Sequence, residues 1–247
     1  MMFDFSGRTL VLTGANGGIG RAAASLFHAA GANLVLADRD ADALATFAAG
    51  LAPDTGAGMV ETLEMDAANP ADADRVIAAA ADLGGVDFLV PSAGIYLAEP
   101  FAQMTDDEWR RTLSINLDGV FYITRRAVDH LAPDSSIVNL SSMAAHRGAM
   151  TNAHYAASKG ALGAMSRALA KELAPRTRVN AVSPGVIETP MTADLIATRG
   201  DDTLRHTPMG RVGRASEIAS VIAFLCSPAA SFVNGETIHV NGGLYMA

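Results

Sequence analysis

Short apolar segments alternate with longer alanine-rich segments along almost the whole chain. The apolar runs predict strands at 9–13, 33–37, 60–65, 86–90, 136–140, 178–182 and 237–240. Helical spacing of apolar residues predicts helices at about 19–30, 40–51, 70–83, 106–131, 153–173 and 216–225. All the strands except 60–65, which contains two glutamates, are continuously apolar. Continuous runs are typical of strands buried on both faces of a parallel sheet.

This alternation predicts an α/β fold, a doubly wound parallel sheet with right-handed crossovers and helices on both faces. No repeat, low-complexity tract or shift in composition divides the sequence, so we expect one domain over residues 1–247. The segment 188–211 has no clear periodicity and contains Pro190, Gly200 and Pro208. We predict that it forms a mobile lid over a site.

Composition removes several functional classes. The net charge of −8 disfavours a nucleic-acid partner, whose phosphates would be repelled. No apolar run approaches the ~20 residues that span a bilayer, and residues 1–8 do not resemble a secretion signal, so we expect no membrane partner and a cytoplasmic location. Cys226 is the only cysteine and lies in an apolar run, which favours a buried small side chain. The six histidines show no metal-ligand spacing, so no metal is expected.

A glycine-rich segment follows the first predicted strand and opens the first predicted helix. It consists of Thr13, Gly14, Ala15, Asn16, Gly17, Gly18, Ile19 and Gly20. Glycines here let the backbone turn tightly and approach a pyrophosphate, which faces the free N–H groups at the helix N-terminus. A tight turn would also explain the glycines, but their position between strand and helix favours dinucleotide binding.

The residues after the second predicted strand bear on which dinucleotide binds. Asp38 lies about twenty residues beyond the glycines, where a carboxylate can accept hydrogen bonds from the adenosine ribose and repel a 2′-phosphate. Arg39 acts in the opposite sense, because a guanidinium could pair with that phosphate. No basic residue within 15–18 assists it, so the sequence favours NAD(H) over NADP(H). Asp38 could instead, or in addition, be the N-cap of the helix expected near residue 40.

Tyr155 and Lys159 are four residues apart, on one face of a predicted helix. A free Tyr has a pKa of about 10 and is a poor base at neutral pH. A nearby cation favours the phenolate, and a shift of about three units corresponds to about 4 kcal/mol, attainable from Lys159 plus a cationic nicotinamide ring. The spacing alone is common on solvated helix faces, so this interpretation needs support from other residues.

Further polar residues follow the other predicted strands. Ser141 and Ser142 end a strand ahead of Tyr155, and Asn116 lies in a helical run. The segment 184–189, with the sequence Pro-Gly-Val-Ile-Glu-Thr, follows the next strand. With the glycine segment and Asp66, this ordered set resembles the short-chain dehydrogenase/reductase family over essentially the whole chain.

The resemblance implies a Rossmann-type sheet of seven parallel strands and a proton relay. Tyr155 would exchange the substrate hydroxyl proton, Ser142 would hydrogen-bond the substrate oxygen, and Lys159 would hold the nicotinamide ribose and lower the Tyr155 pKa. Asn116 would hold a water linking Lys159 to solvent. The other implied cofactor residues are Asp66 and Ala67 at the adenine, Ala93 and Gly94 at the ribose, and Pro184, Gly185, Ile187 and Thr189 towards the carboxamide. Ser142, Asn116 and Thr189 also have structural readings, as a turn, a helix-kink bond and a cap.

The C-terminal segment 235–246 resembles that of bacterial 3-oxoacyl-carrier-protein reductases. Those enzymes typically use NADPH, held partly by a basic residue where this chain has Gly17, and dock an acidic carrier protein through basic residues. Arg176 matches one such position, but the segment 129–134 lacks the other basic cluster. We therefore predict an NAD(H)-dependent oxidoreductase that interconverts a small secondary alcohol (polyol, hydroxyacyl or similar) and its ketone. The alternative is an NADPH-dependent 3-oxoacyl-carrier-protein reductase, and a remote alternative is a non-catalytic nucleotide-binding regulatory protein.

The predicted helix at 153–173 carries more small residues than one catalytic face needs. They are Ala156, Ala157, Gly160, Ala161, Gly163 and Ala164. Small side chains permit close helix–helix approach, and members of the family commonly pair through this helix and the preceding one. We therefore predict a homotetramer, although packing on the protein's own sheet would use one side of the helix in any case.

Overall fold

The computed structural model describes residues 3–51 and 58–246. In this part of the chain a seven-stranded, all-parallel sheet has the order β3-β2-β1-β4-β5-β6-β9. Its strands are β1 (Thr9–Thr13), β2 (Asn33–Asp38), β3 (Val60–Glu64), β4 (Val86–Pro91), β5 (Leu131–Leu140), β6 (Thr177–Pro184) and β9 (Thr237–Val240). The helices are α1 (Gly18–Ala29), α2 (Ala41–Ala49), α3 (Pro70–Asp82), α4 (Asp106–Leu113), α5 (Gly119–Ala127), α6 (Ala144–Arg147), α7 (Ala153–Glu172), α8 (Ala193–His206) and α9 (Ala215–Cys226). The predicted doubly wound, Rossmann-type sheet is confirmed.

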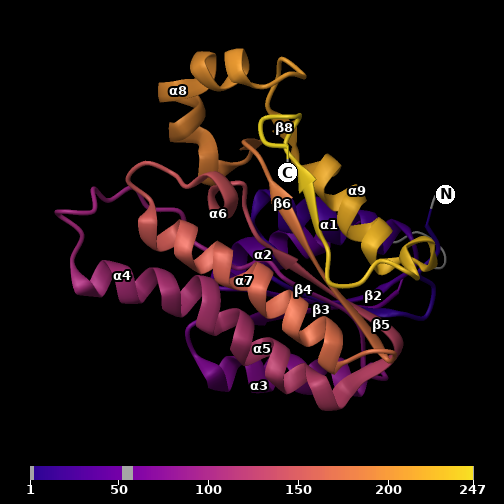
Figure 1. Cartoon of the computed structure of the whole chain (residues 1–247). Helices are drawn as coiled ribbons and strands as arrows, with labels where there is room; N and C mark the ends of the chain where they lie inside the picture. Colours follow the sequence, from indigo (N-terminus) through magenta and orange to yellow (C-terminus); the bar gives the residue numbers. More distant parts are fainter. Residues whose placement is uncertain (1–2, 52–57, 247) are drawn as a thin grey trace.

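Helices cover both faces of the sheet, with α1 and α9 on one side and α3, α5 and α7 on the other (Figure 1). Alternate residues of each strand therefore enter different cores. Leu10 and Leu12 pack beneath α1 and α9, whereas Val11 between them packs beneath α3, α5 and α7. Burial on both faces explains why the strand segments are continuously apolar.

The strand β3 is the exception that the sequence indicated. It forms one edge of the sheet, and its residues are half-buried or exposed, with both Glu61 and Glu64 exposed. Charged side chains on an edge strand also oppose pairing with another sheet.

The prediction of one helix over 106–131 is wrong in its middle and at its end. The chain forms α4, a π-helical turn (Ser114–Asp118), α5 and a short 3₁₀ turn (Val128–His130), and β5 then begins at Leu131. The start of β5 contains Pro133 and Asp134, and Asp134 has a positive φ of 58°. Neither residue is typical of a strand, so the apolar pattern does not predict this part of β5. They fit here because the register between β4 and β5 is irregular at this end of the pair.

The segment predicted as an irregular lid is largely helical. It contains α8, flanked by a two-stranded parallel sheet of β7 (Ile187–Glu188) and β8 (Gly213–Arg214). The helix stands apart from the main sheet (Figure 1), and none of its described side chains is buried. A helix that buries so little needs few apolar residues, which explains why its periodicity is weak.

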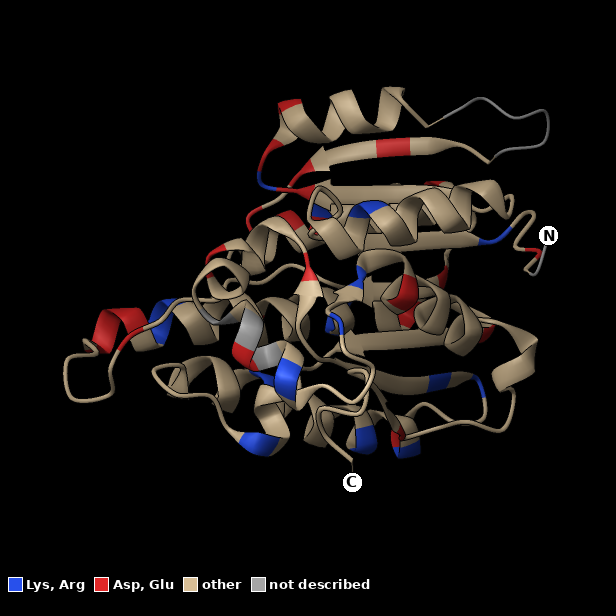
Figure 2. Cartoon of the chain, turned by 90° about the horizontal axis from the view of Figure 1, so that it is seen from above, with Lys and Arg blue, Asp and Glu red and all other residues tan. Residues whose placement is uncertain are grey.

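Charged residues of both signs are interspersed along the fold (Figure 2). Cys226 is buried as expected, and burial raises the pKa of its thiol to about 12. Among the described residues, no helix has the length and apolar character needed to cross a membrane.

Candidate active site

A cavity of about 760 Å³ lies where the carboxyl ends of the parallel strands meet. The chain leaves β1 and β4 in opposite directions across the sheet, and such a switch point is where α/β proteins bind nucleotides. Predicted site residues that line the cavity are Gly14, Asn16, Gly17, Gly18, Ile19, Gly20, Asp38, Arg39, Asp66, Ala67, Ala93, Gly94, Ser142, Tyr155, Lys159, Pro184, Gly185, Ile187 and Thr189. Asn116 is fully buried and is not among the lining residues.

Three glycines leave no space for a side chain at the rim of this cavity. Gly14 has a φ of 66°, and a β-carbon on it would lie 2.6 Å from the backbone nitrogen of Ala93. A β-carbon on Gly20 would lie 2.2 Å from the carbonyl oxygen of Gly14, and one on Gly18 would lie 2.6 Å from Cγ2 of Thr189. The helix α1 starts here, and no side chain caps its first N–H groups. This cradle fits a pyrophosphate approaching the backbone.

Asp38 fixes the glycine segment. Its carboxylate accepts hydrogen bonds from the backbone N–H groups of Asn16 (2.9 Å) and Asp40 (3.2 Å). The alternative interpretation of Asp38 as an N-cap is wrong, because the N-cap of α2 is Asp40, whose side chain accepts from the N–H of Ala43. Each carboxylate oxygen keeps a lone pair, so Asp38 can still accept from a ribose.

Arg21 is a cavity residue that the sequence reasoning missed. Its Nε donates to the backbone oxygen (3.1 Å) and Oδ1 (3.0 Å) of Asn16, and its guanidinium lies 5.0 Å from the ring centroid of Phe47. With Arg39, it adds a second cation to the lining of the cavity that Asp38 also lines. Arg21 lies beyond the glycine turn in the sequence, but from the first turn of α1 its side chain folds back over that turn.

Asn116 and Gly94 connect two predicted catalytic segments. The Asn116 amide pairs with the Ile95 backbone, accepting from its N–H (2.8 Å) and donating to its carbonyl (3.0 Å). A β-carbon on Gly94 would lie 3.2 Å from Oδ1 of Asn116 and 3.7 Å from Nζ of Lys159. Asn116 therefore holds the β4–α4 loop next to the Lys159 ammonium.

Burial controls the protonation of both Lys159 and Tyr155. Lys159 donates from Nζ to the carbonyl of Leu140 (2.8 Å), and burial lowers its pKa to about 8. Burial raises the pKa of Tyr155 to about 12, more than a hydrogen bond with Ser142 lowers it. The ammonium lies 5.8 Å from the centroid of the Tyr155 ring. The expected lowering of the Tyr155 pKa is therefore not produced by Lys159 in the protein by itself.

The start of α7, which carries Tyr155, is fastened to the β4–α4 loop. Tyr96 lies edge-on to the Tyr155 ring, with centroids 4.8 Å apart, and its hydroxyl donates to Oδ1 of Asn152 (3.2 Å). Asn152 in turn donates to the carbonyl of Leu97. Thr151 has a φ of 65°, which is rare for a β-branched residue and indicates local strain next to the site.

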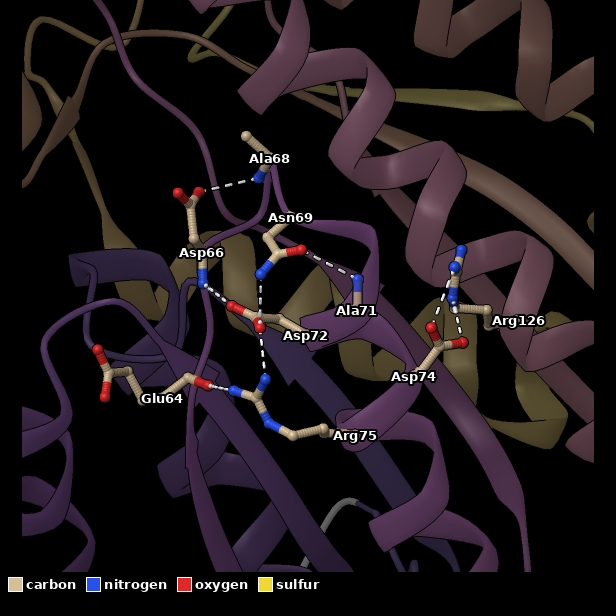
Figure 3. Close-up of polar contacts among 9 residues, drawn as sticks. All are labelled: Glu64, Asp66, Ala68, Asn69, Ala71, Asp72, Asp74, Arg75 and Arg126. Atoms are coloured by element: carbon tan, nitrogen blue, oxygen red, sulfur yellow. Dashed lines mark hydrogen bonds and ion pairs between the residues drawn. The ribbon is translucent and has the colours of Figure 1, made fainter.

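The turn after β3 carries Asp66 and Ala67, which both line the cavity. Figure 3 shows the polar contacts of Asp66 in this turn. Asp66 accepts from the backbone N–H of Ala68 (2.9 Å). Thr189, another residue of the cavity lining, precedes a 3₁₀ turn, and its hydroxyl donates to the Ile187 carbonyl (3.4 Å). The capping role that was the alternative for Thr189 is therefore present, and the residue also lies against Gly18.

Among the described residues, no group of three or more His, Cys, Asp or Glu side chains is placed to hold a metal ion.

Comparison with known proteins gives consistent matches along the chain. The family model described as enoyl-(acyl carrier protein) reductase matches residues 14–245. Nodulation protein G of Rhizobium sp. (strain N33) is 38% identical over 252 residues, which cover 99% of this chain and 100% of that protein. A 3-oxoacyl-(acyl-carrier-protein) reductase of Vibrio cholerae is 36% identical over 247 residues, covering 98% of this chain and 99% of that one.

Two solved structures are similar over nearly their full length. A short-chain dehydrogenase/reductase from Brucella melitensis, described as glucose/ribitol dehydrogenase, superposes with a TM-score of 0.97, at 63% identity and complete coverage of both chains. A putative NAD(P)-dependent gluconate 5-dehydrogenase from Beutenbergia cavernae, with bound NADP at low occupancy, gives a TM-score of 0.90 at 36% identity, covering 98% of each chain.

The buried ammonium of Lys159 predicts a pH dependence of stability. Its pKa falls from 10.5 to about 8 on folding, so between these values the unfolded chain binds more protons and stability rises with pH. From pH 8 to 10 the Lys159 contribution to this rise should be about 2 kcal/mol, and from about pH 9 the raised pKa of the buried Cys226 thiol offsets part of it. Above pH 10 the raised pKa of Tyr155 acts in the opposite sense. Urea unfolding at pH 8, 9 and 10 should therefore show a slope of stability against pH that is more positive in the wild type than in Lys159→Met, because only the wild type has the Lys159 contribution.

Lys171 provides the matched control, because it lies on the same helix and is exposed. Lys171→Met should keep the wild-type slope. Equal slopes in all three proteins would show that the Lys159 ammonium is not desolvated.

Proposed function

Because the chain belongs to the short-chain dehydrogenase/reductase family of NAD(P)-dependent oxidoreductases, we propose that it interconverts a secondary alcohol and its ketone, with Tyr155 as the proton-transfer residue. The observation that carries this proposal is the convergence of Tyr155, Ser142 and Lys159 on the same cavity that the glycine cradle lines. A remote alternative, a regulatory protein without turnover, is set aside because the family consists of oxidoreductases.

A nicotinamide cofactor held at the glycine cradle would supply the hydride chemistry. Tyr155 gives or takes the hydroxyl proton, and Ser142, hydrogen-bonded to it, donates to the substrate oxygen as charge develops there. Lys159 holds the nicotinamide ribose and contributes positive charge near the phenol. The side chain of Asn116 is engaged by Ile95, so in this proposal it holds the loop that shapes the relay, and a water would join through its remaining hydrogen-bonding capacity.

For the substrate, we propose a polyol or similar secondary alcohol. The Brucella melitensis structure described as glucose/ribitol dehydrogenase shares 63% identity over the whole chain, well above the 36% of the carrier-protein reductase from Vibrio cholerae. Arg176 is the basic residue expected to bind a carrier protein, but its guanidinium already donates to the carbonyl of Leu131. 3-Oxoacyl-carrier-protein reduction stays as a second candidate because relatives with that name match the full chain. A turnover screen of polyols, other secondary alcohols, ketones and 3-oxoacyl carrier protein, with each cofactor, separates the two.

We also propose a substrate lid for this cavity. The segment 188–211, with α8, forms a substrate lid over the cavity, since Pro190, Met191 and Thr192 already line it. A cytoplasmic location stays a prediction from the sequence.

Replacing Tyr155 by Phe should lower kcat by at least ~100-fold, because it removes the proton-transfer group. Cofactor affinity, followed by NADH fluorescence, should stay close to that of the wild type. Tyr122→Phe, which deletes a phenol on α5 away from the cavity lining, is the control. A near-normal kcat for a folded Tyr155→Phe protein would refute the assignment.

We propose a preference for NAD(H), on the strength of Asp38, and Asp38→Ala should reverse it in part. Repulsion of a 2′-phosphate at ~4 Å is worth about 1 kcal/mol in water and several times that at a partly buried site, or roughly tenfold to several-hundredfold in preference. The positive charges of Arg21 and Arg39 should reduce the preference for NAD(H) to about the tenfold end of this range. The NADP bound in the Beutenbergia cavernae structure also favours a small preference. The measurement is kcat/KM for both cofactors.

Asp38→Asn refines this test, because it keeps an acceptor for the Asn16 N–H while it removes the charge. Both variants should improve NADP(H) use relative to NAD(H). A wild type that prefers NADPH, or a ratio unmoved by either substitution, would leave Asp38 with only its role in fixing the glycine segment.

We propose that the protein is a homotetramer that pairs partly through α7. This helix turns His154, Ser158, Leu162 and Ser166 inward, whereas Ala157, Gly160 and Ala164 are exposed on its outer side. Phe121 on the neighbouring α5 is 49% exposed. Light scattering at micromolar concentration should report a tetramer, and Ala164→Arg should reduce it to smaller species. A monomeric wild type would contradict the proposal.

A further inference from the structure

Asp72, in the first turn of α3, is a buried carboxylate that no part of the proposed reaction uses. It is 7% exposed, and its side chain accepts three hydrogen bonds from the protein. The donors are the backbone N–H of Asp66 at 2.8 Å, Nδ2 of Asn69 at 2.9 Å and the guanidinium of Arg75 at 2.5 Å. A carboxylate so enclosed costs free energy unless its partners are well placed, so the arrangement needs an explanation.

The three donors come from both sides of a single turn (Figure 3). Asp66 lies at its beginning, and Asn69 is the N-cap of α3, accepting from the N–H of Ala71. Arg75 also donates to the carbonyl of Glu64, the last residue of β3 (2.9 Å). The Asp72 carboxylate therefore joins the end of β3, the turn and the start of α3.

The same turn forms one wall of the cavity through Met65, Asp66 and Ala67. Its other side rests on α5, because a β-carbon on Gly119 would lie 2.7 Å from the carbonyl oxygen of Ala67. The turn cannot move towards α5, and Asp72 prevents it from moving away from α3. Its two cavity residues, Asp66 and Ala67, are thus held from both sides.

We infer that Asp72 is a positioning residue for the adenine end of the cofactor: by holding the Asp66 N–H it fixes the wall against which the adenine packs. This inference rests on the proposed placement of the adenine at Asp66 and Ala67. Asp72 itself does not line the cavity, so in this inference it acts on the cofactor only by holding the turn.

The consequence is a loss of cofactor affinity without a loss of chemistry. Asp72→Ala should raise the dissociation constants of NADH and of AMP, which carries the adenine half alone, by about tenfold, as expected for losing charge-assisted hydrogen bonds that hold the turn. Binding of nicotinamide mononucleotide and kcat at saturating cofactor should stay at wild-type values. Asp72→Asn keeps an acceptor for the Asp66 N–H and should show a smaller effect than Asp72→Ala.

Asp74 provides a matched control two residues away on the same helix. Its carboxylate pairs with Arg126 on α5, not with the turn, and its side chain is 62% exposed (Figure 3). Asp74→Ala should change both dissociation constants by no more than about twofold, as for a surface ion pair. Circular dichroism melting of each variant shows that it is folded, and Asp72→Asn carries the test if Asp72→Ala does not fold.

The outcomes distinguish the positioning role of Asp72 from the proposed placement of the adenine at Asp66 and Ala67. If Asp72→Ala binds AMP as tightly as Asp74→Ala does, or if it loses NADH affinity and kcat together, Asp72 does not position the adenine wall. Asp66→Ala tests the placement independently. Unchanged AMP binding in Asp66→Ala would instead refute the adenine placement itself.

Discussion

Two strand ends meet at the centre of this molecule, with the backbone of Gly14 after β1 lying against the backbone of Ala93 after β4. A β-carbon on Gly14 would lie 2.6 Å from the Ala93 nitrogen, so the contact exists only because one partner has no side chain. This approach sets the floor of the cavity. From it, α1 leads away with uncapped N–H groups on one side, and the loop held by Asn116 leads towards Lys159 on the other.

The polar side chains around this floor act mainly by holding backbone segments in position, and less through their charge. Asp38 ties the glycine segment, Asn116 ties the β4–α4 loop, and Asp72 ties the turn after β3. Each uses a buried or half-buried side chain to hold backbone N–H groups that the sheet leaves unpaired at its edge. Loops at the carboxyl edge of a parallel sheet lack ladder partners, so precise binding there depends on such side chains.

The protein without cofactor does not lower the pKa of the Tyr155 phenol, so in the proposed function the bound cofactor must contribute to that lowering. Burial raises the pKa of its phenol to about 12 and lowers that of Lys159 to about 8, so each group favours its neutral form more than in water. In the proposed function, the added charge and hydroxyls of the cofactor bring Tyr155 towards its working state. Proton transfer would then be coupled to cofactor binding.

The sequence by itself determined the parallel sheet, the departure of β3 from the continuous apolar pattern, and most of the residues that gather at the cavity, because burial on both faces and close backbone approach leave direct marks in residue type. Leu10, Val11 and Leu12 are all apolar for the first reason, and Gly14 is a glycine for the second. Tertiary structure alone decided that α8 is a helix, that β5 starts at Leu131, that Arg21 lines the cavity, and that Asp72 holds the turn after β3. An exposed helix carries little apolar pattern, and a side chain that acts through a hydrogen bond to a distant backbone group carries none, so these features appear only once the chain is folded.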